Sequence, residues 1–455
     1  MTRSGTDRAD PSAPAEGAAG TAPTAPAAPA GSPPQGPGGG DRPPSGDEQP
    51  RGVSRRRLLG WTGAGAALAG AGAVAGYAAA RPGPAPDPSG GVVPFRGPYQ
   101  AGIVTPAQDR LHFVALDLTS VDRASLRSLL QRWTTAAERM TAGAEAAPGG
   151  AVNRNPEAPP SDTGEALGLP ASALTITFGI GGSLLDKLGV PRPPELAELP
   201  PFQGDQLDPA FSGGDLCLQA CANDPQVAVH AVRNLVRTGF GTTSVRWSQL
   251  GFGRTSSTST TQQTHRNLFG FKDGTNNLKA EDAGLLDQQV WVPPTQGPAW
   301  MAGGTYLVAR RIRMHVETWD RTSLAEQESL TGRTKGEGAP IGQAQEFDPP
   351  NLGPGSPIDR DAHIRLASAQ NNGGARILRR GYNFVDGSDG LGHLNAGLFF
   401  VAFMRDPHRQ FVPMQSALAR RDKMMEYIEH TGSAVFAVPP GLADGAYWGQ
   451  RLIDG

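Results

Sequence analysis

The sequence predicts an α+β fold in which two ferredoxin-like domains, each built as β-α-β-β-α-β, bring their sheets face to face. From about residue 98, segments with two-residue hydrophobic alternation are interleaved with segments at helical spacing. The order of elements repeats in two successive halves. The strand-to-helix junction Asn223-Asp224-Pro225 of the first half matches Arg405-Asp406-Pro407 of the second. Facing sheets leave room for a site between or beside them.

The first 50 residues consist mainly of Ala, Pro, Gly, Ser and Thr. Such a composition cannot bury enough apolar surface to offset chain entropy, so we expect residues 1–50 to be a disordered tail.

Residues 51–80 have the parts of an export signal. The run Ser54-Arg55-Arg56-Arg57-Leu58-Leu59 precedes a weakly apolar Gly/Ala-rich segment that ends in Ala78-Ala79-Ala80. Adjacent arginines before such a segment are typical of a twin-arginine signal, which exports folded proteins. We expect cleavage after Ala80 and a linker over residues 81–97; an uncleaved membrane anchor is the alternative.

The first predicted domain spans residues 98–266. Its expected strands are 111–118, 174–179, 214–222 and 243–252, and its expected helices are 121–141 and 225–239, the second capped by Asp224 with Pro225 in its first turn.

The second predicted domain spans residues 267–455 and carries the binding site. Its expected strands are 304–316, 397–404 and 433–438, and its expected helices are 323–330 and 413–430, the latter with Leu418, Met425 and Ile428 on one face.

Charge and cysteine content exclude some classes of protein. The net charge of -2 leaves no basic stripe for nucleic acid. Cys217 and Cys221 lie in an alternating segment that would hold their Cα atoms roughly 13 Å apart. A disulfide needs about 7 Å, so we expect two buried free thiols.

Two stretches carry candidate chemistry. In Gly270-Phe271-Lys272-Asp273-Gly274 the glycines permit a tight turn that presents Asp273 between aromatic residues, where a carboxylate can act as a proton shuttle; an ordinary Asp-Gly turn is the alternative. Between Asp361 and Phe384, the isolated His363 precedes the pair Arg379 and Arg380. Imidazole is a common axial ligand of haem iron, and a permanently charged guanidinium can stabilise a bound oxygen species.

Together, the GFKDG, AHIRLA and ILRRGY segments resemble the dye-decolorizing peroxidases, haem enzymes of two ferredoxin-like domains in a dimeric α+β barrel-like fold. The resemblance runs from about Pro98 to the C-terminus and points to the exported branch of the family. It implies one haem b per chain, extracellular or cell-envelope location by the twin-arginine route, and membrane contact only through the export signal.

The resemblance also assigns roles to residues. His363 is expected to be the proximal metal ligand, Asp273 the distal acid/base and Arg379 the distal guanidinium, with Arg380 as the competing choice. Gly274, Thr275 and Asn276 are expected to line the haem edge, and His265 is a weaker candidate for a propionate contact.

Two departures from the family pattern stand out. Ser368-Ala369-Gln370 replaces a common Asn-Pro-Arg, and Asn395 stands where exported members often have an aspartate. If that position partners the proximal imidazole, Asn395 makes the ligand less electron-donating and raises the reduction potential of the iron.

The expected reaction is peroxide-dependent oxidation of dyes, phenols or other small aromatic one-electron donors. Iron release from haem, with iron-uptake or copper-handling partners, is the alternative that the resemblance leaves open. A ferredoxin-like binding module without any cofactor is the third hypothesis.

Overall fold

The structure, a computed structural model, describes residues 91–455. The strands are β1 Arg110–Leu118, β2 Thr175–Gly181, β3 Leu216–Ala222, β4 Thr243–Phe252, β5 Thr305–Met314, β6 Leu378–Arg379, β7 Tyr382–Ser388, β8 Leu394–Met404 and β9 Ile428–Val438. The helices are α1 Arg123–Thr141, α2 Gly182–Leu188, α3 Pro225–Thr238, α4 Ala283–Gln289, α5 Val316–Trp319, α6 Leu324–Thr331, α7 His363–Leu366, α8 Pro407–Arg421 and α9 Gln450–Ile453, with 3₁₀ turns at Pro194–Leu196, Pro209–Phe211, Ala299–Met301, Ala369–Asn372 and Lys423–Glu426.

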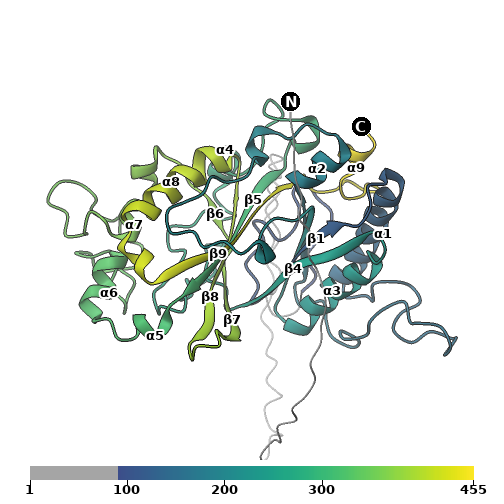
Figure 1. Cartoon of the computed structure of the whole chain (residues 1–455), viewed down its shortest axis with the longest axis horizontal. Coiled ribbons are helices and arrows are strands. Elements are labelled where there is room, and N and C mark those ends of the chain that lie inside the picture. The colour runs from purple at the N-terminus through teal and green to yellow at the C-terminus, as the bar shows by residue number, and fades with distance from the viewer. Residues whose placement is uncertain (1–90) are drawn as a thin grey trace, which may run out of the picture. The chain divides into compact units, whose positions relative to one another are not determined.

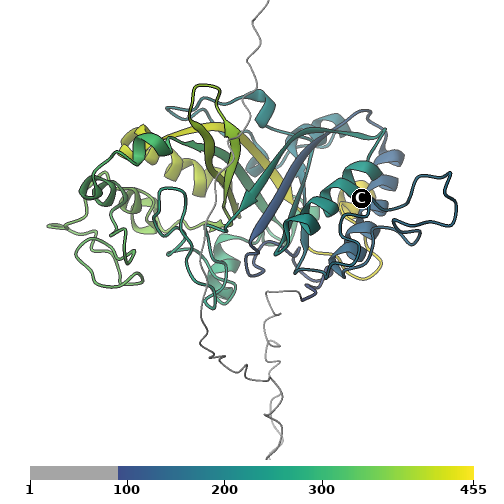
Figure 2. The same ribbon diagram turned by 90° about the horizontal axis from the view of Figure 1, so that it is seen from below.

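The strands form one sheet that closes on itself like a barrel. Neighbouring strands follow the order β5-β9-β2-β3-β1-β4-β7-β8-β6, and β5 also pairs with β8. The two halves of the chain meet where β4 pairs with β7 and where β2 pairs with β9. Figures 1 and 2 show α1 and α3 on one side of this barrel and α5 to α8 on the other. The predicted α+β class is confirmed.

Aromatic side chains fill the barrel. Phe113 stacks on Trp247 with ring centroids 5.2 Å apart and meets Phe399 edge-on. Cys217 and Cys221 belong to the same buried cluster and are free thiols, as predicted, and burial raises the pKa of Cys217 well above its usual value. A second core lies outside the barrel, where α1 and α3 cover β1 to β3.

The two matching junctions are helix starts. The carboxylates of Asp224 and Asp406 each accept hydrogen bonds from the first backbone N–H groups of α3 and α8, and a proline follows each cap. A short side-chain acceptor at the N-cap and a proline at the first helical position are both favoured there.

The last predicted helix, residues 413–430, was wrong in its bounds. Helix α8 begins one residue after Asp406 and ends at Arg421; Met425 lies in the 3₁₀ turn that follows, and Ile428 begins β9. Pro413 is tolerated inside α8 on its exposed side. The apolar residues of 413–430 that were assigned to one helical face therefore belong partly to α8 and partly to the start of β9.

Strands β6 and β7 were not predicted. They divide residues 378–388 at Gly381, where a Cβ atom would lie 2.8 Å from the Thr255 hydroxyl. A larger residue at this break would displace the Thr255 side chain. The break separates the two short strands, which lie on the same side of β8.

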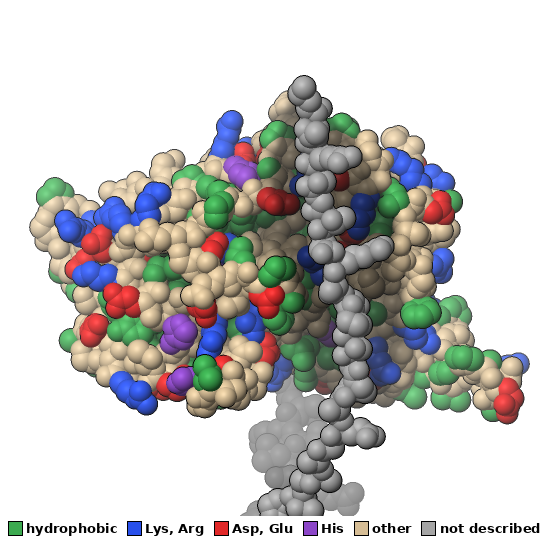
Figure 3. Space-filling view, viewed as in Figure 1, with side chains coloured by type: hydrophobic (Ala, Val, Ile, Leu, Met, Phe, Trp, Pro, Cys, Tyr) green, Lys and Arg blue, Asp and Glu red, His purple; other side chains and the backbone are tan. Residues whose placement is uncertain are grey.

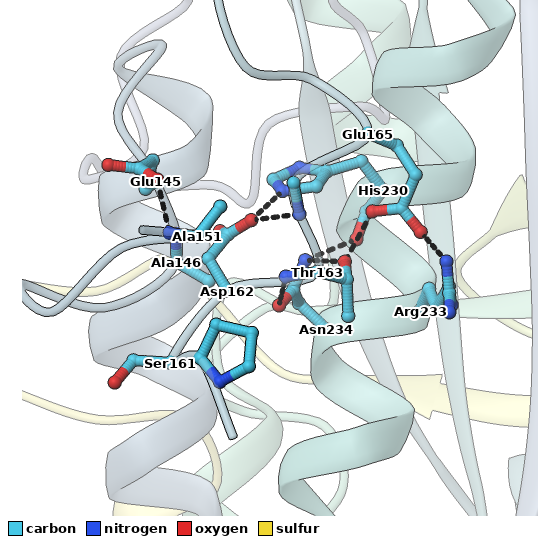
Figure 4. Close-up of polar contacts among 12 residues, drawn as sticks. Glu145, Ala146, Ala151, Ser161, Asp162, Thr163, Glu165, His230, Arg233 and Asn234 are labelled. Carbon is cyan, nitrogen blue, oxygen red and sulfur yellow. Dashed lines mark hydrogen bonds and ion pairs between the residues drawn. The ribbon is translucent and has the colours of Figure 1, made fainter. Parts of the chain in front are cut away.

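A long loop between α1 and β2 is tied to α3 by a buried polar network (Figure 4). His230 Nε2 lies 2.8 Å from Asp162 Oδ1, and the Asp162 carboxylate also accepts the N–H groups of Ala146 and Gly164. Asn234 bonds to Thr163 in the same network. These contacts are remote from the candidate site described below.

Basic and acidic side chains are interspersed on the face seen in Figure 3, as the small net charge suggests. Among residues 91–455, no helix combines the length and apolar character that crossing a membrane requires. The predicted tail, signal and most of the linker lie outside the described residues.

Candidate functional site

A cavity of about 650 Å³ opens in the second half of the chain, between the segment after β4, α7, β6 and α8. Its apolar lining includes Phe269, Phe271, Ile364, Ile377, Phe400, Phe411, Met414, Leu418 and Met424. All six residues predicted for the site line it: Asp273, Gly274, Thr275, Asn276, His363 and Arg379. The structure thus brings together two sequence stretches that are about ninety residues apart.

His363 is the first residue of α7, and its imidazole is hydrogen-bonded to a carboxylate. Its Nδ1 lies 2.6 Å from Asp422 Oδ2, and 36% of its side chain is accessible whereas Asp422 is buried. Burial disfavours the charged imidazole, but the Asp422 carboxylate outweighs it, and the pKa of His363 is raised. With Nδ1 engaged, Nε2 is the nitrogen available for a ligand.

The condition set for position 395, that it partners His363, is not met. The Asn395 side chain instead accepts a hydrogen bond from Arg311, 3.1 Å away, in a cluster on the far strands of the barrel. Asp422 takes the role because the end of α8 folds back against α7, a contact over 59 positions of sequence. Nothing in the local sequence around Asp422 indicates this contact.

Asp273 and Arg379 form an ion pair at the cavity. Arg379 Nη1 donates to Asp273 Oδ1 over 2.6 Å, and Asn267 Nδ2 lies 3.4 Å from the other carboxylate oxygen. Gly270 and Gly274 both have φ of +82°, so the expected tight turn is present. A Cβ on Gly274 would lie 2.8 Å from Ser256 Cα, which explains the requirement for Gly at that position.

Strand alternation separates Arg379 from Arg380. Arg379 faces the cavity, whereas the fully buried Arg380 points the other way and donates to the Thr105 carbonyl at 2.5 Å and to the Gln108 side chain. Arg380 therefore anchors the first half of the chain, and only Arg379 is placed for chemistry in the cavity.

Cationic side chains gather along the Thr275 side of the cavity. Lys272, Arg333 and Arg376 all line it. Lys272 Nζ donates to Glu346 over 2.6 Å, Arg333 donates to the Glu346 carbonyl, and Arg376 reaches Asn276. Burial raises the pKa of Glu346, but hydrogen bonds from Lys272 and two threonines outweigh it and lower the pKa. Sequence reasoning missed this group because no single motif contains it.

His265 does not line the cavity; its carbonyl accepts the N–H of Asp273, so it supports the turn through the backbone. Burial lowers the pKa of its imidazole.

Two family models match this chain. Residues 100–253 match the family described as "Dyp-type peroxidase, N-terminal", and residues 264–443 match "Dyp-type peroxidase, C-terminal". The chain is 41% identical over 377 residues to a dye-decolorizing peroxidase of Thermobifida fusca, covering 78% of this chain and 84% of the relative. It is 38% identical over 415 residues to the deferrochelatase of Escherichia coli K12, covering 88% of this chain and 97% of the relative.

Solved structures show the same likeness. Ferric DtpA from Streptomyces lividans superposes with a TM-score of 0.73 at 39% identity, covering 81% of this chain and 98% of that one. The family models and these relatives define a peroxidase. The chain belongs to the Dyp-type peroxidase family, whose members are haem enzymes.

The residues present fit a haem. The cavity lies within the roughly 300–1,000 Å³ typical of ligand sites, and its wall is mainly apolar with cations on one side, as a flat macrocycle with carboxylate arms requires. Within residues 91–455 no three or more His, Cys, Asp or Glu side chains cluster as metal ligands. The porphyrin already binds the iron of a haem, so a single ligand from the protein is sufficient. An imidazole that is hydrogen-bonded to a carboxylate is a ligand of this kind.

Proposed function

We propose that His363 is the proximal ligand of haem b, bound once per chain, and that Asp273 and Arg379 carry out the distal chemistry of this haem peroxidase. The observation that carries the proposal is the 2.6 Å Arg379–Asp273 pair in the cavity that also exposes His363. Gly274, Thr275 and Asn276 follow Asp273 in the cavity wall and would line the edge of a bound haem. Lys272, Arg333 and Arg376 are the cations available to its carboxylates.

A haem held by His363 would supply the redox chemistry, namely the two-electron reduction of hydrogen peroxide and the one-electron oxidation of a dye or phenol. Asp273 takes the proton of the inner peroxide oxygen on its carboxylate and returns it to the outer oxygen. The Arg379 guanidinium, already aimed at that carboxylate, stabilises the negative charge that develops as the O–O bond breaks. Asp422 keeps the imidazole of His363 oriented throughout.

Peroxide-dependent dye oxidation by Asp273→Asn tests the proposal. The amide cannot shuttle the proton, so we expect the rate per haem to fall about 10²–10⁴-fold while haem content stays that of the wild type. A rate equal to that of the wild type at full haem occupancy would show that Asp273 is not the acid/base.

Release of iron from haem is the second candidate, favoured by the 38% identity to the deferrochelatase of Escherichia coli over 97% of its length. Iron-uptake or copper-handling partners belong to that candidate. Incubating the haem-loaded protein with a ferrous chelator and assaying both free iron and intact porphyrin separates it from peroxidase turnover.

The proposal also covers the organisation of the chain. Residues 98–266 and 267–455 are taken as two ferredoxin-like domains. When β6 and β7, which both pair with β8, are counted as one interrupted strand, each half has its strands in the order last, first, third, second: β4-β1-β3-β2 and β9-β5-β8-β7. The matching caps of α3 and α8 support the duplication. Expression of residues 98–266 alone as a folded domain would support this division.

Export by the twin-arginine route, with residues 51–80 as the signal, 81–97 as the linker that follows it and an extracellular or cell-envelope destination, is proposed from Arg55, Arg56 and Ala80. Replacing both arginines by lysine should retain the protein inside the cell. The mature N-terminus should begin at Arg81.

A further inference from the structure

Strand β6, which carries Arg379, has one edge without a strand partner. It pairs with β8 through Leu378↔Phe403 and Arg379↔Ala402, and it ends the sheet order of the described residues. The outer edge therefore presents the N–H and the C=O of Arg379 without a ladder. Partly buried backbone groups of this kind need other partners.

The side chain of Asn277 supplies both. Its Oδ1 accepts the Arg379 N–H over 2.8 Å, and its Nδ2 donates to the Arg379 carbonyl over 2.8 Å. Because an N–H can only donate and a C=O can only accept, the orientation of the carboxamide is defined. Nδ2 also donates to the Ser257 carbonyl at 3.0 Å, and Asn277 is only 6% exposed.

Asn277 lies in the loop that presents Asp273. Its N–H donates to the Gly274 carbonyl, and the loop packs on residues 255–258 so closely that a Cβ at Gly274 would clash with Ser256. Asp273 itself accepts from the guanidinium of Arg379. The same short loop thus contacts Arg379 twice: Asn277 bonds to its backbone and Asp273 to its guanidinium.

We propose that Asn277 is the positioning residue of Arg379, replacing the missing strand at the outer edge of β6 and thereby coupling the distal arginine to the distal aspartate. The inference rests on the proposed role of Arg379. A guanidinium displaced by about 1 Å from the developing charge can lose about 10²-fold in rate, so a backbone contact remote from the peroxide controls the chemistry.

Amide hydrogen exchange in the haem-loaded protein tests the contact directly. In Asn277→Ala the Arg379 N–H loses its acceptor and should exchange at least tenfold faster, whereas the neighbouring Arg380 N–H, bonded to the Val401 carbonyl at 2.7 Å, should stay protected. Asn277→Asp keeps an acceptor but no donor, so protection of Arg379 should persist. Unchanged exchange at Arg379 in Asn277→Ala would overturn the proposal.

The second measurement is the rate constant for reaction with hydrogen peroxide. We expect Asn277→Ala to lower it about 10–100-fold and Asn277→Asp to lower it less, with the KM for the dye unchanged in both. Asn234→Ala is the matched control, because Asn234 is equally buried and multiply bonded but lies in the remote network of Figure 4. It should destabilise the fold without slowing the peroxide reaction.

Parallel measurement on Arg379→Ala separates the two proposals. If Arg379→Ala leaves the peroxide reaction at the wild-type rate, the proposed function of Arg379 fails. If Arg379→Ala slows it and Asn277→Ala does not, only the positioning role fails. Equal slowing of Asn277→Ala and Asn234→Ala would also overturn the positioning role, because it would reflect general loosening.

Discussion

Asp422 determines the electronic character of the His363 imidazole. Asn395 alone would indicate a proximal ligand without a negatively charged partner, but in the structure the buried Asp422 carboxylate lies 2.6 Å from His363 Nδ1. A carboxylate partner makes an imidazole a stronger donor, so the iron should have a low reduction potential.

The reduction potential of the bound haem checks this account of Asp422. Asp422→Asn removes the negative charge, and we expect the potential to rise and activity or haem affinity to fall about 10–100-fold. Asn395→Asp should leave the potential unchanged, because Asn395 contacts Arg311 and not His363. A shift in Asn395→Asp with none in Asp422→Asn would reverse the assignment.

His430 is a buried histidine in β9. Burial, and then the charge of Arg310, lower the pKa of His430 to about 3. Asp205 lies 4.0 Å from its Nδ1 but is bonded to Arg310, and Gln415 faces its other nitrogen. The imidazole is therefore neutral in the fold and charged in the unfolded chain below about pH 6.5.

The pKa of His430 is lower in the folded than in the unfolded protein, so protonation of the unfolded chain favours unfolding. The stability of the fold is therefore unaffected by His430 above about pH 6.5 and decreases as the pH falls toward 3. The free energy of unfolding should drop more between pH 7 and pH 5 in the wild type than in His430→Gln. Urea denaturation at both pH values measures the free energy of unfolding of each protein. An equal drop between pH 7 and pH 5 in the wild type and in His430→Gln would contradict this prediction.

At the scale of elements, helix caps were predictable and helix ends were not. Asp224-Pro225 marked the start of α3, and the same signature at Asp406-Pro407 marks the true start of α8. The end of α8 depends on tertiary contacts, because Asp422 turns away to His363 and to the next 3₁₀ turn. Such an ending carries no glycine or other local stop.

Removing the cap of α8 should affect stability and the site together. Asp406→Ala removes acceptors of two N–H groups and should lower the free energy of unfolding by about 1 kcal/mol. Because Met414 and Leu418 of α8 line the cavity, haem affinity should also decrease. Asp224→Ala is the control: a similar loss of stability measured by urea denaturation, with haem affinity unchanged.

For the whole molecule, the repeated element order predicted the α+β class, and the described residues confirm it with a closed sheet. Closure itself was not predictable, since it depends on the β4–β7 and β2–β9 contacts between residues far apart in sequence. The same limit applies to the site. Motifs located His363, Asp273 and Arg379, but the residues that hold them, Asp422 and Asn277, became visible only through tertiary contacts.

The proposed function requires haem to bind in this cavity through His363. This requirement is tested by titrating ferric haem into the purified protein and following the Soret absorption. We expect one haem per wild-type chain, a lost or strongly weakened and shifted band in His363→Ala, and wild-type binding in His265→Ala, whose side chain does not line the cavity. Wild-type affinity and an unshifted Soret band in His363→Ala would show that His363 does not bind the haem iron.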